Sequence, residues 1–155
     1  MKKFFFISGF YIFFSACSPL DTFQNAVSIP SQKWLYTYTP EFNAAISDTS
    51  VKYNVFVILR HTDAYKYNNL WIRLGSKAPG DIMRYQNINL TLSNDINGWE
   101  GKGMDDIFEV RKNITPGPIP FNKAGTYTFS IAQIMRENPL QHILNVGIRI
   151  EKVKL

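Results

Sequence analysis

Short stretches in which apolar and polar residues alternate are the feature that most restricts the fold of this chain. In residues 125–134, Tyr127, Phe129 and Ile131 alternate with threonine and serine, and residues 143–153 show the same pattern. Successive side chains of a strand point to opposite faces, so this alternation predicts strands with one buried face. No segment of ten or more residues has the spacing of an amphipathic helix.

Gly, Pro, Asn and Asp separate the alternating stretches, as they do between antiparallel strands. We expect strands at 33–38, 51–60, 70–74, 82–92, 107–112, 125–134 and 143–153. Residues 51–60 carry Phe56 and Ile58 on the second face, so both faces are expected to be partly covered. Trp34 and Trp71 lie in strands and are expected to be core or half-buried. The last two strands are expected to pair as a long antiparallel arm.

Seven or eight strands with such spacing predict an all-β fold, an antiparallel β-sandwich with a jelly-roll-like order, rather than a closed barrel. We place this domain at residues 33–155. Residues 17–32 are polar, contain prolines at 19 and 30, and show no sustained period, so we interpret them as a flexible tether.

The first sixteen residues predict a signal peptide, with Lys2 and Lys3 before an apolar run over 4–14. That run is too short for a membrane-spanning helix, which needs about 20 apolar residues. Residues 14–17, FSAC, resemble the lipobox of bacterial lipoproteins, in which the cysteine receives a diacylglycerol before cleavage on its amino side. We therefore expect Cys17, the only cysteine, to anchor the protein to a membrane through acyl chains. Ordinary secretory cleavage with a free thiol is the alternative.

Charge and composition argue against a nucleic-acid partner. Removal of the signal peptide leaves fifteen basic and twelve acidic residues, and the basic residues are scattered singly rather than grouped. A chain of about 139 residues suits one core, and with a single cysteine it must be stabilised by packing alone.

Catalytic and metal-binding patterns are weak. His61 and Asp63 could suggest a base and its orienting carboxylate, but residues on an extended strand do not make that contact easily. Neither histidine has zinc-ligand spacing, and we expect no catalytic residue, metal or cofactor. The acidic residues Asp95, Glu100, Asp105, Asp106 and Glu109 offer oxygens of the kind that calcium accepts. Their spacing misses that of an EF-hand loop, so we expect solvated loop charges, with a calcium site as the alternative.

Two segments are candidate binding surfaces. Residues 98–103 lack the pattern of a phosphate loop, so Trp99 is either a core cap or an exposed anchor for a protein or sugar. The turn at 136–138 is either a local ion pair or a charged docking tip. The candidate binding residues are Trp99, Gly101, Lys102, Gly103, Asp106, Glu109, Arg136, Glu137 and Asn138.

Three segments together resemble the gliding-motility lipoprotein GldH family of Bacteroidetes: YNVFVILRHTD (53–63) with YNNLW (67–71), GWEGKGMDDIFE (98–109), and QIMRENPL (133–140) with NVGIRIE (145–151). The family pattern has a glycine where Asp105 stands. If that glycine served a positive φ, the loop here is expected to differ.

The resemblance implies a lipid-anchored envelope protein required for gliding over surfaces, a process tied in these bacteria to type IX secretion. It implies no catalytic residues. We expect a non-enzymatic component or assembly factor that binds other gliding or secretion envelope proteins, with an envelope polysaccharide-binding module as the alternative. Ser18 after Cys17, and the lack of an acidic run there, favour an outer-membrane anchor facing the periplasm.

Overall fold

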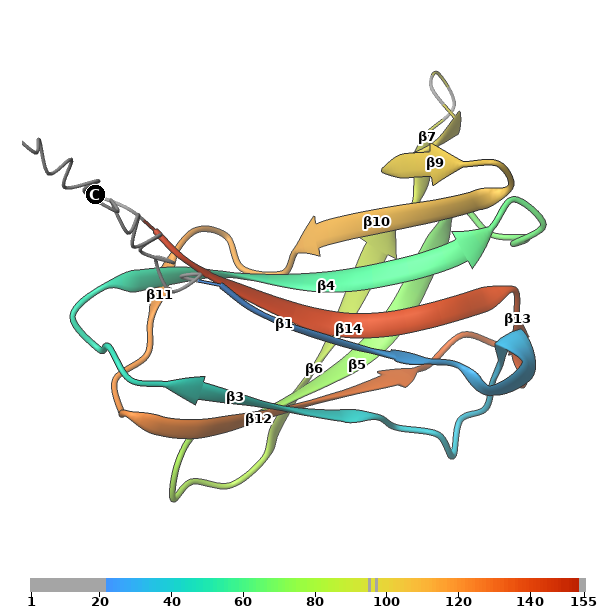
Figure 1. Cartoon of the computed structure of the whole chain (residues 1–155). Helices are drawn as coiled ribbons and strands as arrows, with labels where there is room; N and C mark the ends of the chain where they lie inside the picture. Colours follow the sequence, from blue (N-terminus) through green and yellow to red (C-terminus); the bar gives the residue numbers. More distant parts are fainter. Residues whose placement is uncertain (1–21, 95, 97, 154–155) are drawn as a thin grey trace, which may run out of the picture.

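A computed structural model describes residues 22–94, 96 and 98–153. The predicted signal peptide (1–16) and Cys17 lie outside these residues. The described chain forms two antiparallel β-sheets that face each other as a sandwich (Figure 1). No helix in this part of the chain is long and apolar enough to cross a bilayer.

The first sheet has the order β1-β14-β4-β10-β9, with β11 pairing to the start of β4. Its strands are β1 (Thr22–Ser28), β4 (Lys52–Thr62), β9 (Lys102–Met104), β10 (Ile107–Asn113), β11 (Ile119–Pro120) and β14 (Ile143–Lys152). The second sheet has the order β3-β12-β5-β6. Its strands are β3 (Glu41–Ile46), β5 (Asn69–Lys77), β6 (Arg84–Thr91) and β12 (Gly125–Gln133).

The eight longer strands pair in a nested order. Along the chain the outermost pair is β1 with β14, followed inward by β3 with β12, β4 with β10, and β5 with β6. Successive pairs alternate between the two sheets, as expected when a long hairpin is rolled into two facing sheets of a jelly roll. The predicted arm between the last two strands is wrong, because β12 pairs with β3 and β5 while β14 lies in the other sheet.

The strand count is higher than the predicted seven or eight, since the described residues contain fourteen strands. The additional ones include short pieces that pair locally: β2 (Lys33–Trp34) with β13 (Leu140–Gln141), and β7 (Ser93–Asn94) with β8 (Gly98–Trp99). The strand predicted at 33–38 ends at Trp34 because a turn follows it. In that turn the amide of Tyr38 donates to the carbonyl of Leu35, and the indole Nε1 of Trp34 donates to the carbonyl of Tyr38 at 2.8 Å.

The tether prediction is wrong for residues 22–32. Thr22–Ser28 forms β1, which pairs with β14 from Thr22 opposite Glu151 to Ser28 opposite Asn145. A 3-10 turn at Pro30–Gln32 then leads into β2. The domain therefore begins at or before Thr22 rather than at the predicted boundary. The sequence did not predict this strand because its exposed glutamine and asparagine interrupt the apolar pattern of a strand at the edge of the sheet.

The core is filled by the alternate side chains that face between the sheets. In β3, exposed Glu41, Asn43 and Ala45 alternate with buried Phe42, Ala44 and Ile46. The largest side chains without exposed surface include Trp34, Phe42, Leu59, Leu70, Ile72, Leu92, Ile131, Leu140, Ile143, Ile148 and His61. Burial of this apolar area is the main contribution to stability, since the described residues hold no cysteine.

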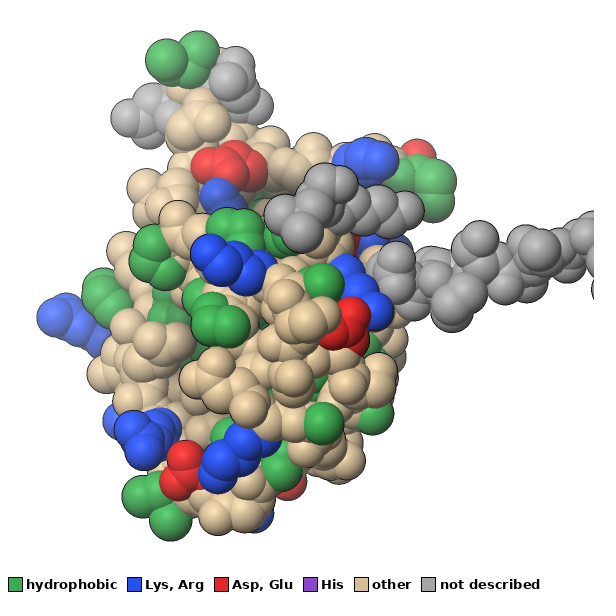
Figure 2. Space-filling view, turned by 90° about the vertical axis from the view of Figure 1, so that its left-hand side faces the viewer, with side chains coloured by type: hydrophobic (Ala, Val, Ile, Leu, Met, Phe, Trp, Pro, Cys, Tyr) green, Lys and Arg blue, Asp and Glu red, His purple; other side chains and the backbone are tan. Residues whose placement is uncertain are grey.

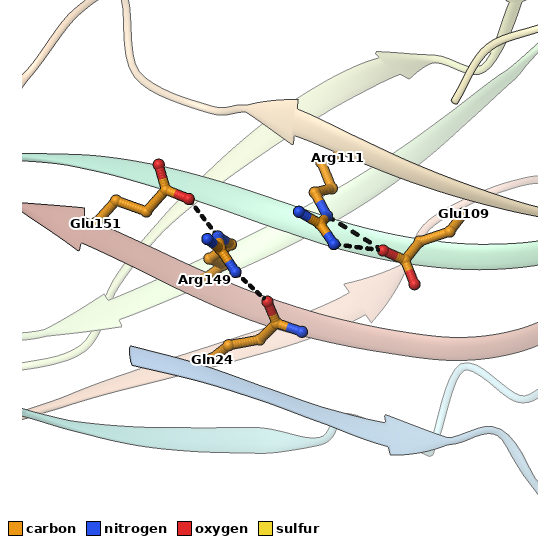
Figure 3. A network of polar contacts seen from close by, with 5 residues as sticks. All are labelled: Gln24, Glu109, Arg111, Arg149 and Glu151. Atoms are coloured by element: carbon orange, nitrogen blue, oxygen red, sulfur yellow. Dashed lines mark hydrogen bonds and ion pairs between the residues drawn. The ribbon is translucent and has the colours of Figure 1, made fainter. Parts of the chain in front are cut away.

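The outer face of the first sheet is also covered along its centre, as the sequence predicted for β4. Ile58 is only 2% exposed although it lies on that outer face, and Phe56 is half-buried. Two arginines lie on the neighbouring strands, Arg149 directly opposite Phe56 and Arg111 opposite Ile58. Arg149 bonds to Gln24 and Glu151, and Arg111 to Glu109 (Figure 3). Such pairs hold the arginine stems over apolar side chains while the charged groups stay in water.

The pairing of β1 can be tested at Gly147 in β14. A Cβ added at Gly147 would lie 2.4 Å from the carbonyl oxygen of Asn25 and 2.6 Å from the Cβ of Ala26. Gly147→Ala must therefore push β1 away, and we expect it to destabilise the fold by about 1–3 kcal/mol. Thermal unfolding should show a lower Tm, and hydrogen exchange should show faster exchange in residues 22–28.

Gly117→Ala is the matched control, because nothing lies within 4 Å of its added Cβ. It should change the free energy of unfolding by less than about 0.5 kcal/mol. Equal stability and exchange for the two variants would contradict the close packing of β1 on β14.

Candidate functional site

The candidate binding residues lie at one end of the sandwich, which we call the distal end. It is the end where β4 and β12 finish and β10 and β14 begin, opposite to the end where β1 starts at Thr22 (Figure 1). The antiparallel register places Ile107 and Ile143 beside the last residues of β4. Segments that are far apart in the sequence therefore meet around this end.

A cluster of aromatic rings closes the distal end of the core. His61 is fully buried, and its ring centroid lies 4.6 Å from Trp99, 5.6 Å from Tyr65 and 5.8 Å from Phe108. Trp99 is half-buried and packs against the core. Of the two alternatives that the sequence left open, this geometry favours a core cap over a freely exposed anchor.

His61 is held as a neutral ring. Its Nδ1 lies 2.8 Å from the carbonyl oxygen of Thr62, so Nδ1 carries the proton, while no described residue hydrogen-bonds to the buried Nε2. Burial lowers the pKa of His61 below its ordinary value, and this outweighs the opposing hydrogen bond to Thr62. Burial likewise raises the pKa of Tyr65. Since Asp63 is exposed, the enclosed imidazole does not form an orienting pair with it.

The glycines at positions 101 and 103 let neighbouring groups pack closely against the backbone. Gly101 has φ +97°, and a Cβ there would lie 2.1 Å from the carbonyl oxygen of Glu109. A Cβ at Gly103 would lie 2.9 Å from the ring of Phe108. Only glycine fits at residue 101, since both the positive φ and the space exclude a side chain.

The turn that joins β9 to β10 resolves the question raised by Asp105. Met104 pairs with Ile107, which leaves Asp105 and Asp106 as a two-residue turn. Asp105 has a positive φ, so it adopts the left-handed conformation that a glycine at this position would favour. The predicted change of loop shape is therefore not required, because aspartate tolerates this conformation better than most side chains.

Two of the acidic residues of this region, Glu100 and Glu109, are engaged in local ion pairs. Glu100 pairs with Lys112, and Glu109 accepts two hydrogen bonds from Arg111 at 2.9 and 3.1 Å. The backbone carbonyl of Asp106 accepts from the amide of Asp63. Asp95 lies outside the described residues. No group of three or more His, Cys, Asp or Glu that could hold a metal ion occurs among the residues that the structure describes.

The buried side chain of Gln133 positions the turn at 136–138. Its amide nitrogen lies 3.2 Å from the carbonyl oxygens of Trp34 and Glu137, and its oxygen accepts from the amide of Met135. The side chain of Asn138 accepts from the amide of Tyr36 at 2.9 Å. The turn is thus fixed to the segment after β2. Arg136 and Lys102 remain exposed, and neither has an ion-pair partner among the described residues.

The two predicted segments are linked through Tyr65 and Tyr67. The hydroxyl of Tyr67 donates to the carboxylate of Glu137 at 2.8 Å, and its ring packs 5.7 Å from Tyr65, which in turn contacts Trp99 and His61. The hydrogen bond to Glu137 raises the pKa of Tyr67. Lys66 lies 3.9 Å from the same carboxylate. Trp99 and the 136–138 turn are therefore joined by one chain of contacts, which runs through the buried ring of Tyr65.

A groove that no sequence motif predicted lies on the outer face of the second sheet. It has a volume of about 830 Å³, and its lining includes Tyr36, Glu41, Arg73, Tyr85, Ser130 and Met135. A second recess, lined in part by Tyr67, Trp71 and Arg136, shares Ile134 and Met135 with it. Trp71 is 42% exposed and Tyr85 64% exposed, so the expected core or half-buried place of Trp71 is wrong. The alternation pattern could have predicted this exposure, since Trp71 lies between Leu70 and Ile72, which point to the buried face.

The lowered pKa of His61 predicts a pH dependence of stability. Below about pH 6.5 the imidazole of the unfolded chain becomes protonated, whereas that of the folded protein stays neutral to a lower pH. The contribution of His61 to the free energy of unfolding is therefore fully present above that pH and is lost as the pH falls. Between pH 7.5 and 5 the loss is at most about 2 kcal/mol for an imidazole that stays neutral when folded. Urea unfolding across this range should show it.

His61→Phe should remove this pH dependence whatever its own effect on stability. The matched control is His142→Asn, which replaces the other histidine with a residue that tolerates the positive φ found there. A wild-type slope in the His61→Phe protein would show that another group is responsible.

Comparisons with known proteins match nearly the whole described chain. The model of the GldH lipoprotein family matches residues 21–150. The chain is 27% identical to a gliding motility lipoprotein GldH homolog of Christiangramia forsetii, over 91% of this chain and 90% of that protein. It is 28% identical to the gliding motility lipoprotein GldH of Flavobacterium johnsoniae, over 88% of each chain. The protein therefore belongs to the GldH family of gliding motility lipoproteins, as its sequence motifs predicted.

Proposed function

We propose that this protein is a non-enzymatic, lipid-anchored component or assembly factor of the gliding and type IX secretion apparatus, and that it binds an envelope protein through the distal end. Family membership supports a gliding motility lipoprotein held in the cell envelope by a membrane anchor. The single observation that carries the binding surface is the connection of Trp99 to the 136–138 turn through Tyr65 and Tyr67.

The distal surface has the composition of a protein-binding patch. Half-buried Trp99 and Tyr67 and exposed Met104 provide apolar area, and exposed Lys102 and Arg136 carry positive charge. Tyr, Trp, Met and Arg are enriched at protein interfaces, and rim charges steer association. The backbone beneath this patch is held by the Gln133 hydrogen bonds and by the packing of Gly101, so the surface is preorganised.

A binding role, rather than catalysis, fits the state of the titratable groups. His61 is enclosed by rings and kept neutral, and Glu100, Glu109 and Glu137 are each paired with a lysine, arginine or tyrosine. A general base must reach the proton that it abstracts. These groups instead hold the shape of the distal end.

We place the anchor at Cys17 in the outer membrane, with the domain facing the periplasm. Ser18 follows the cysteine, and only Pro19, Leu20 and a single acidic residue, Asp21, come next. Surface-exposed lipoproteins of these bacteria often carry an acidic run at that point, and this chain has none.

Complementation of a deletion strain tests the proposal. Deletion of the gene should abolish spreading, and the wild-type gene should restore it. Cys17→Ala should fail because the anchor is lost, and the double variant Lys102→Glu, Arg136→Glu should fail because both rim charges are reversed. A crosslinked envelope protein should co-purify with the wild type and be lost from the double variant.

Asn25→Glu is the matched control, since it adds a charge at an exposed site in the middle of β1, away from the distal end. It should restore spreading at the same protein level. A deletion strain that spreads normally would refute the role in gliding, and restored spreading by the double variant would refute the distal surface. Membrane fractionation and protease treatment of intact complemented cells check the outer membrane and its periplasmic face.

A second candidate function, binding of an envelope polysaccharide, is favoured by the groove on the second sheet. The exposed side chain of Tyr85 lines this groove, and that of Trp71 lines the adjoining recess. Arg73 and Glu41 supply polar groups beside the small side chains of Ser130 and Ala132. Exposed rings with a few placed polar groups are suited to stack and hydrogen-bond a sugar.

Affinity electrophoresis in gels that contain purified envelope polysaccharide tests this second function. The wild type should be retarded, and Tyr85→Ala should bind about fivefold more weakly if the lost ring contact contributes about 1 kcal/mol. Met104→Ala, at an exposed site on the distal end, should behave as the wild type. Unretarded migration of the wild type would remove this candidate.

A further inference from the structure

The start of β1 fixes where the domain meets its anchor. Thr22 lies at the end of the sandwich opposite to the distal end, and we call it the proximal end. Thr22 comes five positions after Cys17 in the sequence. Even when fully extended, so short a segment spans only about 18 Å. An acylated Cys17 therefore holds the proximal end close to the lipid headgroups.

The distal end lies well beyond the reach of the anchor segment when the domain stands on its proximal end. Strand β4 runs from the proximal to the distal end, from Lys52 to Thr62. At the usual rise of a strand its length is about 36 Å, which is about twice the reach of the anchor segment. Exposed apolar residues at the distal end, such as Met104, are thus kept from the bilayer when the domain stands on its proximal end.

The proximal end carries lysines that lack a carboxylate partner. Lys52, Lys77 and Lys123 are exposed there, and none forms an ion pair with a described residue. The carboxylates described at this end are already engaged, Asp48 with Lys152, Asp81 with Arg84 and Glu151 with Arg149. Figure 2 looks onto this end and shows lysine and arginine side chains spread among apolar ones, with few carboxylates.

An exposed apolar side chain stands among these charges. Ile82 follows β5 in the loop at 78–83 and is 73% exposed. Beside it, a recess of about 470 Å³ opens between the sheets, and its lining includes Lys77, Ile82, Ile114, Ile119 and Phe121. Apolar side chains ringed by lysines suit the boundary between headgroups and acyl chains, where the lysine stems and Ile82 meet apolar surface and the ammonium groups meet phosphates.

We infer that the proximal end is a membrane-docking surface, on which Lys52, Lys77 and Lys123 contact anionic lipid headgroups and Ile82 enters the interface. The bound lipid surface stands the domain upright, so that its distal end points away from the membrane. This inference rests on the lipid anchor at Cys17 proposed above, and it does not depend on the identity of the distal partner. Attraction of basic residues to anionic lipids is additive and screened by salt.

Quenching of a fluorophore on the acylated protein tests the orientation. Acylation blocks the sulfur of Cys17, the only cysteine, so Ile82→Cys introduces a single reactive thiol. The protein is reconstituted in vesicles of phosphatidylethanolamine and phosphatidylglycerol. The label at residue 82 should be quenched by spin-labelled lipid and lose its quenching by aqueous acrylamide. A label at Met104→Cys, an equally exposed distal position, should show the opposite pattern.

The charge contribution is tested in the same assay. The triple variant Lys52→Glu, Lys77→Glu, Lys123→Glu should lose lipid quenching of the residue 82 label. The protein with its three lysines intact should lose the same quenching in phosphatidylcholine vesicles or at high salt. Persistent lipid quenching in the triple variant would overturn the role of the lysines. Equal acrylamide quenching at residues 82 and 104, or lipid quenching at 104, would overturn the upright orientation.

Mass spectrometry of the purified protein separates the two failures. An unmodified Cys17 would refute the anchor on which the inference rests. A diacylated Cys17 together with a water-exposed residue 82 would refute the docking surface alone and leave the proposed function standing.

Discussion

The antiparallel pairing of β4 with β14 is the interaction on which the rest of the structure depends. These two long strands are neighbours in the centre of the first sheet, and their inward side chains, such as Leu59 and Ile148, are almost completely buried. β14 holds β1 on its other side, and β4 holds β10. The edges of the sheet, including the strand that leads to the anchor and the strands that build the distal surface, are thus attached to a common centre.

The register of this central pair also determines what meets at each end. It sets Ile143 opposite His61, and β10 sets Phe108 opposite the same histidine, so His61 becomes the centre of the aromatic cluster. At the other end it sets Lys152 opposite Tyr53, beside the start of β4 and near Asp48. A one-residue shift would move every one of these side chains to the opposite face of the sheet. Both surfaces therefore depend on one register.

Much of the fold could be predicted because strands with one buried face leave a period-two pattern. That pattern identified β4, β5, β6, β10, β12 and β14 with small errors at their ends. It failed for β1 and β3, where exposed Gln24, Asn25 and Asn43 and the small Ala44 weaken the apolar signal. Partner choice was beyond the pattern, since pairing between strands distant in the chain depends on the packing of the whole sandwich. The supposed arm of β12 and β14 failed for this reason.

The same distinction applies to the candidate site. Local chemistry suggested Trp99, the glycines and the 136–138 turn as candidates. Only the fold joins them, through Tyr65 and Tyr67, in a connection that carried no sequence motif.

A jelly roll places the two ends of its long strands on opposite sides of one core, and we propose that this protein uses both. Strand β1, which leads to the proposed anchor, begins at the proximal end. The exposed residues Lys102, Met104 and Arg136 lie at the distal end. A domain bound at the membrane by its proximal end exposes its distal surface one strand length away, within reach of partners in the envelope. Because the strands between them are continuous and buried, the core holds the two surfaces at a fixed spacing and orientation. The lipid and the partner then need no direct contact with each other for the protein to position one relative to the other.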